Sequence, residues 1–220
     1  MLEAAPRLLL VAHGTASAAG SATTARLTDA VRTARPSIPV DLCFLDVVDP
    51  RLPDVLDDRP TVLVPLLLST GYHVQTDIPA AVAPYPATRV ARHLGPDDRL
   101  VTLLLDRLGP VPAGAGVALV GAGSSRPEAR AELEETGRRL AAQLGRDVRV
   151  LTMGDDLRTA FAALAPVAVA TYLLADGQFV DTLQAAADGL GQVAPPLGVH
   201  PELVRLVWDR YDRSLDSALG

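Results

Sequence analysis

The stretch Thr61-Val-Leu-Val-Pro-Leu-Leu-Leu-Ser-Thr-Gly71 decides the fold, because its pattern returns at Val167-Ala-Val-Ala-Thr-Tyr-Leu-Leu-Ala-Asp-Gly177. The two stretches align without a gap, and each is an apolar run that ends in a small-residue turn. A run of this kind, bounded by turn residues, is typical of a buried strand. Leu8–Thr15 aligns with Val117–Ser124 in the same way. We therefore predict that one structural unit occurs twice in the chain.

Short apolar runs alternate with amphipathic stretches on both sides of these segments. The runs that we predict as strands are 8–12, 40–45, 61–68, 88–91, 117–120, 148–151 and 167–174. The stretches that we predict as helices are 17–34, 126–144 and 155–164, with a last helix that begins at His200. This alternation predicts parallel sheets with helices on their faces. The expected fold class is α/β, with two duplicated small domains and a cleft between them.

A linker stands near the middle of the chain, at Gly109-Pro110-Val111-Pro112-Ala113-Gly114. It predicts a first domain over residues 1–110 and a second over residues 111–220. The expected ligand site is the crevice that faces the carboxyl ends of the strands in both domains. Because one chain can close such a cleft by itself, a monomer and a homodimer both remain open.

The composition of the 220 residues, 49% hydrophobic and 21% charged, is that of a globular protein. The net charge is −6 and no basic run occurs, which argues against nucleic acid as a partner. No apolar run approaches the ~20 residues of a membrane span, and 8–12 is too short for a signal peptide. Cys43 is the single cysteine, which excludes an intrachain disulfide and a cysteine zinc site. We expect a cytoplasmic protein with no membrane partner.

The two halves differ at three positions that matter for chemistry. Three metal-competent side chains of the first half fall opposite apolar ones: His13 opposite Ala122, His73 opposite Phe179, and Asp46 near Met153. Each half is a structural control for the other, so the fold itself did not require these polar groups. Two imidazoles and a carboxylate suit a divalent ion such as Fe(II), Co(II) or Ni(II), with coordination positions left open. We predict that His13, His73 and Asp46 form a metal site.

Structural interpretations of the same residues stay open beside this one. Both histidines could be satisfied side chains at strand ends. Asp46 could be a turn residue, and the Asp49 that follows it would cap a helix that starts at Pro50. Cys43 alternates with Phe44 and is expected to be a buried small hydrophobe.

Three turns rich in hydrogen-bond donors are candidate substrate contacts. Two of them, Gly14–Ser17 and Gly123–Pro127, lead into helices, where a hydroxyl can cap the helix and free N–H groups attract anions. The third, Ser69–Gly71, is followed by Tyr72. The residues that we predict to bind substrate are Thr15, Ser69, Thr70, Gly71, Tyr72, Ser124, Ser125 and Arg126. Arg126 could add a bidentate contact to a carboxylate.

The remaining histidines and aromatic residues receive structural interpretations. His93 could reach the cleft, although a surface position is the preferred interpretation, and His200 is read as a surface residue. Trp208 and Tyr211 are three residues apart on the last helix, which favours anchoring that helix to a core over stacking on a ligand.

At these residues the chain resembles the class II tetrapyrrole chelatases, in particular the sirohydrochlorin chelatase family of siroheme and cobalamin synthesis. The matching segments are Leu8–Thr15, Phe44–Asp46, Val64–Pro79, Leu94–Pro96 and Pro196–Gly198. The segment around His73 is the most specific of these, and the resemblance covers nearly the whole chain.

The resemblance implies two α/β domains with a macrocycle between them, and an enzyme that inserts a divalent metal into sirohydrochlorin. Two histidines, matching His13 and His73, would handle the metal and the pyrrole protons. Asp46 stands where the family usually has Glu, and Gln75 stands where a basic residue is frequent. Fe(II) is the preferred metal and Co(II) or Ni(II) the alternative. No permanent cofactor is implied, and no Walker-type nucleotide loop occurs in the sequence, consistent with insertion without ATP.

Two other functions remain open. The first strand is also similar to that of the histidine phosphatases, but Ala12 stands where they carry an arginine before the histidine. A carrier that binds a metal or a tetrapyrrole without turnover would fit the same residues.

Overall fold

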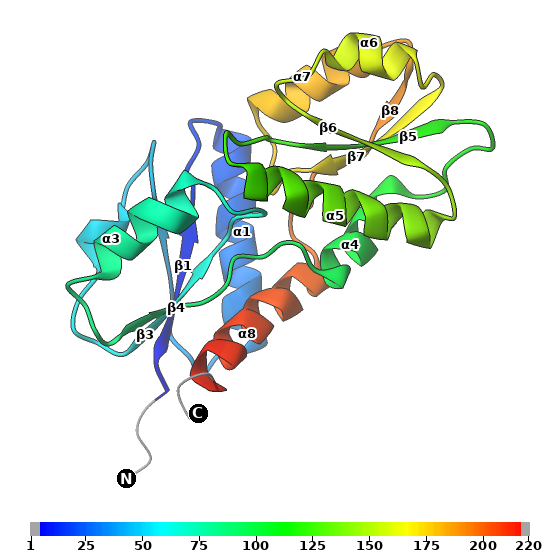
Figure 1. Cartoon of the computed structure of the whole chain (residues 1–220). Coiled ribbons are helices and arrows are strands. Elements are labelled where there is room, and N and C mark those ends of the chain that lie inside the picture. The colour runs from blue at the N-terminus through cyan, green and yellow to red at the C-terminus, as the bar shows by residue number, and fades with distance from the viewer. Residues whose placement is uncertain (1–4, 217–220) are drawn as a thin grey trace.

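Each half of the chain forms a parallel sheet of four strands in the computed structural model, which describes residues 5–216 (Figure 1). The first sheet has the order β2-β1-β3-β4, built from Arg7–Ala12 (β1), Val40–Phe44 (β2), Thr61–Pro65 (β3) and Thr88–Val90 (β4). The second has the order β6-β5-β7-β8, built from Gly116–Gly121 (β5), Val148–Thr152 (β6), Val167–Tyr172 (β7) and Gly191–Val193 (β8). The identical strand orders confirm the predicted α/β fold with two similar halves.

Helices connect the strands and cover both faces of each sheet. In the first half they are Ala18–Ala34 (α1), Leu52–Val55 (α2), the π-helix His73–Asp77 (η1), Ile78–Val82 (α3) and Asp98–Leu108 (α4). In the second half they are Pro127–Leu144 (α5), Leu157–Ala162 (α6), Gln178–Ala187 (α7) and Pro201–Asp216 (α8). Helix α1 begins as its sequence predicts, because the Ser17 hydroxyl accepts a hydrogen bond from the N–H of Gly20.

Several predicted boundaries differ from the observed ones. Strand β3 ends at Pro65 rather than at residue 68, because the chain turns out of the sheet towards His73. The prediction that a helix starts at Pro50 is wrong: α2 starts at Leu52, and Arg51 occupies its N-cap. Strand β8 was not predicted, since three residues with one apolar side chain carry too little pattern.

The alternation of side chains in β1 separates two apolar cores. Leu8 and Leu10 point to one face of the first sheet and join the largest cluster of buried residues. Leu9 and Val11 point to the opposite face, where they pack with Cys43, confirming that this cysteine is buried. Successive side chains of a strand point to opposite faces of the sheet. Since both sets are buried in β1, both faces of the first sheet are covered there.

The last helix of each half packs on the other half. Helix α4 contacts β7 and α5 of the second half, while α8 contacts β3 and α1 of the first. Figure 1 shows α8 lying beside α1, against the first sheet rather than the second. As a result the largest apolar cluster runs through both halves, from Leu8 and Leu10 to Leu119 and Tyr172. The division of the chain into domains at residue 110 remains a prediction. It separates the two sequence repeats, whereas α4 and α8 each pack on the half to which they do not belong.

Aromatic residues fix α8 on the first half. Trp208 and Tyr211 are buried with their ring centroids 5.3 Å apart, which confirms that they anchor the helix to a core. The Trp208 indole N–H donates to the carbonyl of Val31, and the Arg35 guanidinium lies 4.6 Å from the centre of the Trp208 ring. Arg35 also forms a bidentate ion pair with Asp212, at 2.6 and 2.7 Å. Such paired, planar contacts are stronger than ordinary surface ion pairs.

We predict that Trp208→Ala lowers the free energy of unfolding by about 3–5 kcal/mol, because it opens a cavity where α8 meets the first half. Urea denaturation of the full chain measures this loss. The matched control is Arg205→Ala on the exposed side of the same helix, expected to change the free energy of unfolding by no more than about 0.5 kcal/mol. Equal effects of the two variants would contradict the anchoring role of Trp208.

Candidate metal and substrate site

His13 stands immediately after β1, on the turn that leads to α1. Its carbonyl accepts a hydrogen bond from the N–H of Asp46, so the ends of β1 and β2 are tied together. Gly14 follows with φ +99°, and a Cβ atom there would lie 1.9 Å from the carbonyl oxygen of Asp46. Only glycine tolerates both the positive φ and this close approach. The tight turn leaves the His13 side chain exposed at the carboxyl edge of the first sheet.

His73 is the first residue of the π-helix η1, which follows the loop after β3. The turn begins at Gly71, whose carbonyl accepts a hydrogen bond from the N–H of Gln75. Helical turns of this wide type are frequent at functional sites. The His73 side chain is 31% exposed, so a ligand can reach it.

The structure brings the two imidazoles together. The ring centroids of His13 and His73 lie 4.8 Å apart, with an angle of 84° between the ring planes. A metal–imidazole bond is about 2.0–2.1 Å long, so one ion can reach a nitrogen of each ring at this separation. These residues are 60 positions apart in sequence and meet because β1 and β3 are adjacent parallel strands.

Asp77, which is not among the predicted site residues, contacts His73. The Nδ1 atom of His73 lies 2.5 Å from Oδ2 of Asp77, one turn further along the same helix. A hydrogen bond at Nδ1 leaves Nε2 as the atom available to a metal, and a carboxylate partner makes the ring a better ligand. The spacing of four residues between His73 and Asp77 was the available sequence signal.

Asp46 does not complete a three-ligand site. Its Oδ1 accepts hydrogen bonds from the N–H of Val47 and from the guanidinium of Arg51, at 2.8 and 2.9 Å. These contacts, the backbone one first, lower the pKa of Asp46, and nearby His13 adds a smaller effect. Within residues 5–216 no three His, Cys, Asp or Glu side chains are grouped as a metal site would require. The two histidine rings lie together, and Oδ1 of Asp46 is engaged by its own turn and by Arg51, so the part of Asp46 in a metal site stays a prediction.

The predicted substrate-binding turns are partly occupied by their own hydrogen bonds. Thr15 and Ser124 accept bonds through their hydroxyls from backbone N–H groups two residues further on, at Ser17 and Arg126. Both donor groups of Thr70 bind Glu132 of the second half. Both donors of Thr70 are therefore engaged within the protein, and a substrate contact at Thr70 stays a prediction.

Other predicted contacts remain accessible. Tyr72 is 55% exposed, and the guanidinium carbon of Arg126 lies 6.0 Å from the centre of its ring. This cation–π contact joins the first half to the second at the edge of the histidine pair. Ser125 is exposed, Ser69 and Gly71 are partly exposed, and a Cβ atom at Gly71 would meet nothing within 4 Å.

Two histidines differ from their predicted surface positions. His93 is only 6% exposed, and its Nε2 lies 3.1 and 3.2 Å from the two carboxylate oxygens of Glu132. Burial lowers the pKa of His93, while the Glu132 charge opposes that shift. His200 is partly buried: its Nδ1 accepts the N–H of Glu202 at the start of α8, and its Nε2 pairs with Asp106.

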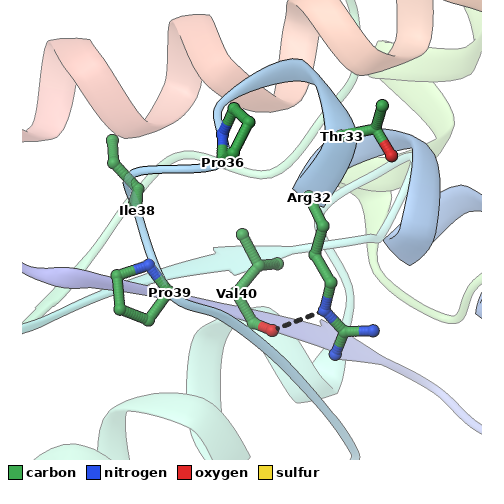
Figure 2. A pocket seen from close by; sticks show the side chains of 6 residues that line it. All are labelled: Arg32, Thr33, Pro36, Ile38, Pro39 and Val40. Carbon is green, nitrogen blue, oxygen red and sulfur yellow. Dashed lines mark hydrogen bonds between the residues drawn. The ribbon is translucent and has the colours of Figure 1, made fainter.

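A hollow elsewhere on the surface is separate from this site. It lies between the end of α1 and the start of β2 and is lined by Arg32, Thr33, Pro36, Ile38, Pro39 and Val40 (Figure 2). Arg32 donates there to the carbonyl of Val40. Because Val40 begins β2 whereas His13 follows the end of the parallel strand β1, the hollow and the histidine pair lie at opposite edges of the sheet.

Among residues 5–216, no helix has the length and apolar character of a membrane span.

Solved structures with the same fold include three bacterial proteins. SirB from Bacillus subtilis with Fe3+ has 19% identity and a TM-score of 0.81, covering 96% of this chain and 95% of that one. The sirohydrochlorin chelatase SirB from Bacillus subtilis subspecies spizizenii, in complex with cobalt, has 20% identity and a TM-score of 0.78, covering 96% of each chain. CbiX, the terminal enzyme for biosynthesis of siroheme in denitrifying bacteria, has 24% identity and a TM-score of 0.68, covering 97% of this chain and 100% of that one.

At these identities the structural similarity establishes the fold alone. No curated protein matches the sequence. The model of the CbiX family matches the chain twice, over residues 7–110 and again over residues 116–214. Since the two matches leave out only the ends of the chain and the linker, this protein belongs to the CbiX family.

Proposed function

We propose that this chain is a sirohydrochlorin chelatase, which inserts a divalent metal into sirohydrochlorin without ATP. The observation that carries the proposal is the contact between the His13 and His73 rings, 4.8 Å apart at the carboxyl edge of the first sheet. Membership of the CbiX family supports it, as do the related folds of SirB and of CbiX, the latter an enzyme of siroheme biosynthesis. The metal and the tetrapyrrole are both substrates, and no permanent cofactor is proposed.

The reaction exchanges one divalent ion for two pyrrole protons. Neutral imidazoles bind such an ion and release it again, and an imidazole near neutral pH also accepts protons. We assign metal delivery and proton acceptance to His13 and His73. Asp77 holds Nδ1 of His73 and so directs Nε2 towards the ion. Asp46 assists by its charge, with Oδ1 held by Arg51 and by the N–H of Val47.

The second half supplies contacts for the acidic side chains of the macrocycle. Arg126 is the proposed cation, because its guanidinium lies over the ring of Tyr72, the neighbour of His73. Ser69, Gly71, Thr15, Ser124 and Ser125 stand on the surrounding turns and remain proposed substrate contacts. We place the reaction in the cytoplasm, in a chain that acts as a monomer or homodimer.

Fe(II) is the proposed metal, with Co(II) or Ni(II) as the alternative. The SirB structures contain Fe3+ in one case and cobalt in the other. The deciding experiment supplies sirohydrochlorin with each of the three ions under anaerobic conditions and follows insertion by absorbance. Fastest insertion of Fe(II) supports siroheme synthesis, whereas fastest insertion of Co(II) or Ni(II) supports the alternative. Binding of both substrates without turnover would identify a carrier.

We predict that His13→Ala and His73→Ala each lower the insertion rate by at least about 100-fold, because each removes a metal ligand and proton acceptor. Initial rates with saturating metal measure the effect. His200→Gln is the matched control, since His200 lies at the start of α8 and keeps no contact with the pair. A double variant that retains the wild-type rate would overturn the assignment.

We predict that Asp77→Ala weakens Co(II) binding by about 10–100-fold, the usual cost of removing the partner of a metal-bound histidine. Asp77→Asn should be milder, because an amide oxygen still accepts from Nδ1. Visible absorption titrations give both affinities. Asp181→Ala, at an exposed position of α7 in the second half, is the control. Equal affinities for Asp77→Ala and the wild type would exclude this role.

We predict that Arg51→Ala raises the pKa of Asp46 towards its ordinary value, without reaching it, because the Val47 N–H bond remains. In the wild type the pKa of Asp46 is lower in the folded state than in the unfolded state. The ionised carboxylate therefore stabilises the folded state when the pH is above the pKa of the unfolded state, and this stabilisation is lost as the pH falls through the pKa of the folded state. NMR titration of the Asp46 carboxyl carbon measures the shift. An unchanged pKa would show that Arg51 does not hold this group in solution.

A further inference from the structure

The loop that leads from β3 to His73 is held by side chains of the second half. The Tyr172 hydroxyl donates to the carbonyl of Leu68 at 3.1 Å. Two residues later, the N–H of Thr70 donates to Oε2 of Glu132 at 2.5 Å, and its hydroxyl donates to Oε1 at 3.0 Å. Tyr172 ends β7 and Glu132 lies on α5, so two separate elements of the second half hold Leu68 and Thr70 of the first.

The carboxylate at the centre of these contacts is largely removed from water. The Glu132 side chain is 20% exposed, and both of its oxygens also lie within 3.2 Å of Nε2 of buried His93. A buried carboxylate is costly without partners, and hydrogen bonds to it are stronger than those between neutral groups. The Thr70 contacts are therefore expensive to break, and they fix the position of the loop backbone.

Gly95 makes the Tyr172 contact possible. A Cβ atom at this position would lie 2.2 Å from the Leu68 carbonyl oxygen and 2.2 Å from the Tyr172 hydroxyl. Any larger residue would occupy the space in which these two groups meet. The neighbouring N–H of Leu94 donates to the carbonyl of Leu67, so the loop is held on this side too.

The held segment directly precedes the metal-site histidine. Gly71 follows Thr70, and its carbonyl accepts from the N–H of Gln75 to open the π-helix that carries His73. The position of His73 therefore depends on the residues just before Gly71, which are the ones that the second half holds.

We propose that Glu132 is a positioning residue for the metal site: through Thr70 it sets where His73 stands relative to His13. Tyr172 supports the same segment through Leu68. The inference rests on the proposed function for its metal chemistry, and it gives the second half a task that needs no imidazole of its own.

The test compares Co(II) binding and the visible Co(II) spectrum in Glu132→Ala, Glu132→Gln and the wild type. Glu132→Ala should weaken Co(II) binding by about 10-fold or more and change the spectrum, because His73 is no longer fixed. Glu132→Gln should restore most of both, since its amide oxygen accepts from the Thr70 N–H and its amide N–H donates to the Thr70 hydroxyl. Glu134→Ala, at an exposed position of the same helix, should match the wild type.

Urea denaturation checks that each variant is folded at the temperature of the titration. If Glu132→Ala fails to fold, the combined Thr70→Val and Tyr172→Phe variant replaces it, and a smaller weakening in the same direction is expected, because the backbone N–H of residue 70 still donates to Glu132. A folded Glu132→Ala, or that combined variant, with wild-type affinity and spectrum overturns the proposal. Because Co(II) binding is read without the macrocycle, a chain that binds Co(II) through the histidine pair but never inserts it refutes the proposed function alone.

Discussion

The apolar core shared by α1, α4, α5 and α8 is the contact on which both sheets depend. Each sheet buries one face under a helix that the other half provides, so neither half has a complete core by itself. Burial of apolar area is the main favourable term in folding, and here most of it spans the two halves. The carboxyl edges of the sheets are consequently held in one fixed relation, and the loops at those edges can form contacts between halves.

The two halves contribute different side chains to the site. The first half carries both imidazoles and the Asp77 carboxylate, while the second half carries Phe179, 48% exposed, in the region that corresponds to His73. The two sheets have equivalent carboxyl edges, and the pair of imidazole rings lies at the edge of the first. The other edge provides cationic and carboxylate side chains, Arg126 and Glu132, that reach the loop around the histidine pair.

Much of the fold and part of the site could be predicted from residue pattern alone. The parallel sheets and the duplication follow from apolar runs in equivalent places, and the pairing of His13 with His73 follows from their positions after strands of one sheet. The order of the strands was not predicted. The helix exchange could not be predicted, because α4 and α8 are equally amphipathic whichever sheet they cover. The buried state of His93 was missed for a related reason: its partner, Glu132, is 39 residues away in the other half and gives no local signal.

The exchange of α4 and α8 also bears on how such a chain could arise. A polypeptide with a single repeat would have a last helix that cannot cover its own sheet, and it would complete its core only by trading that helix with a second copy. Joining the two copies through residues 109–114 turns such an intertwined dimer into one molecule. Once the copies are fused, their sequences are free to diverge, and an asymmetric centre built from one copy becomes accessible to evolution.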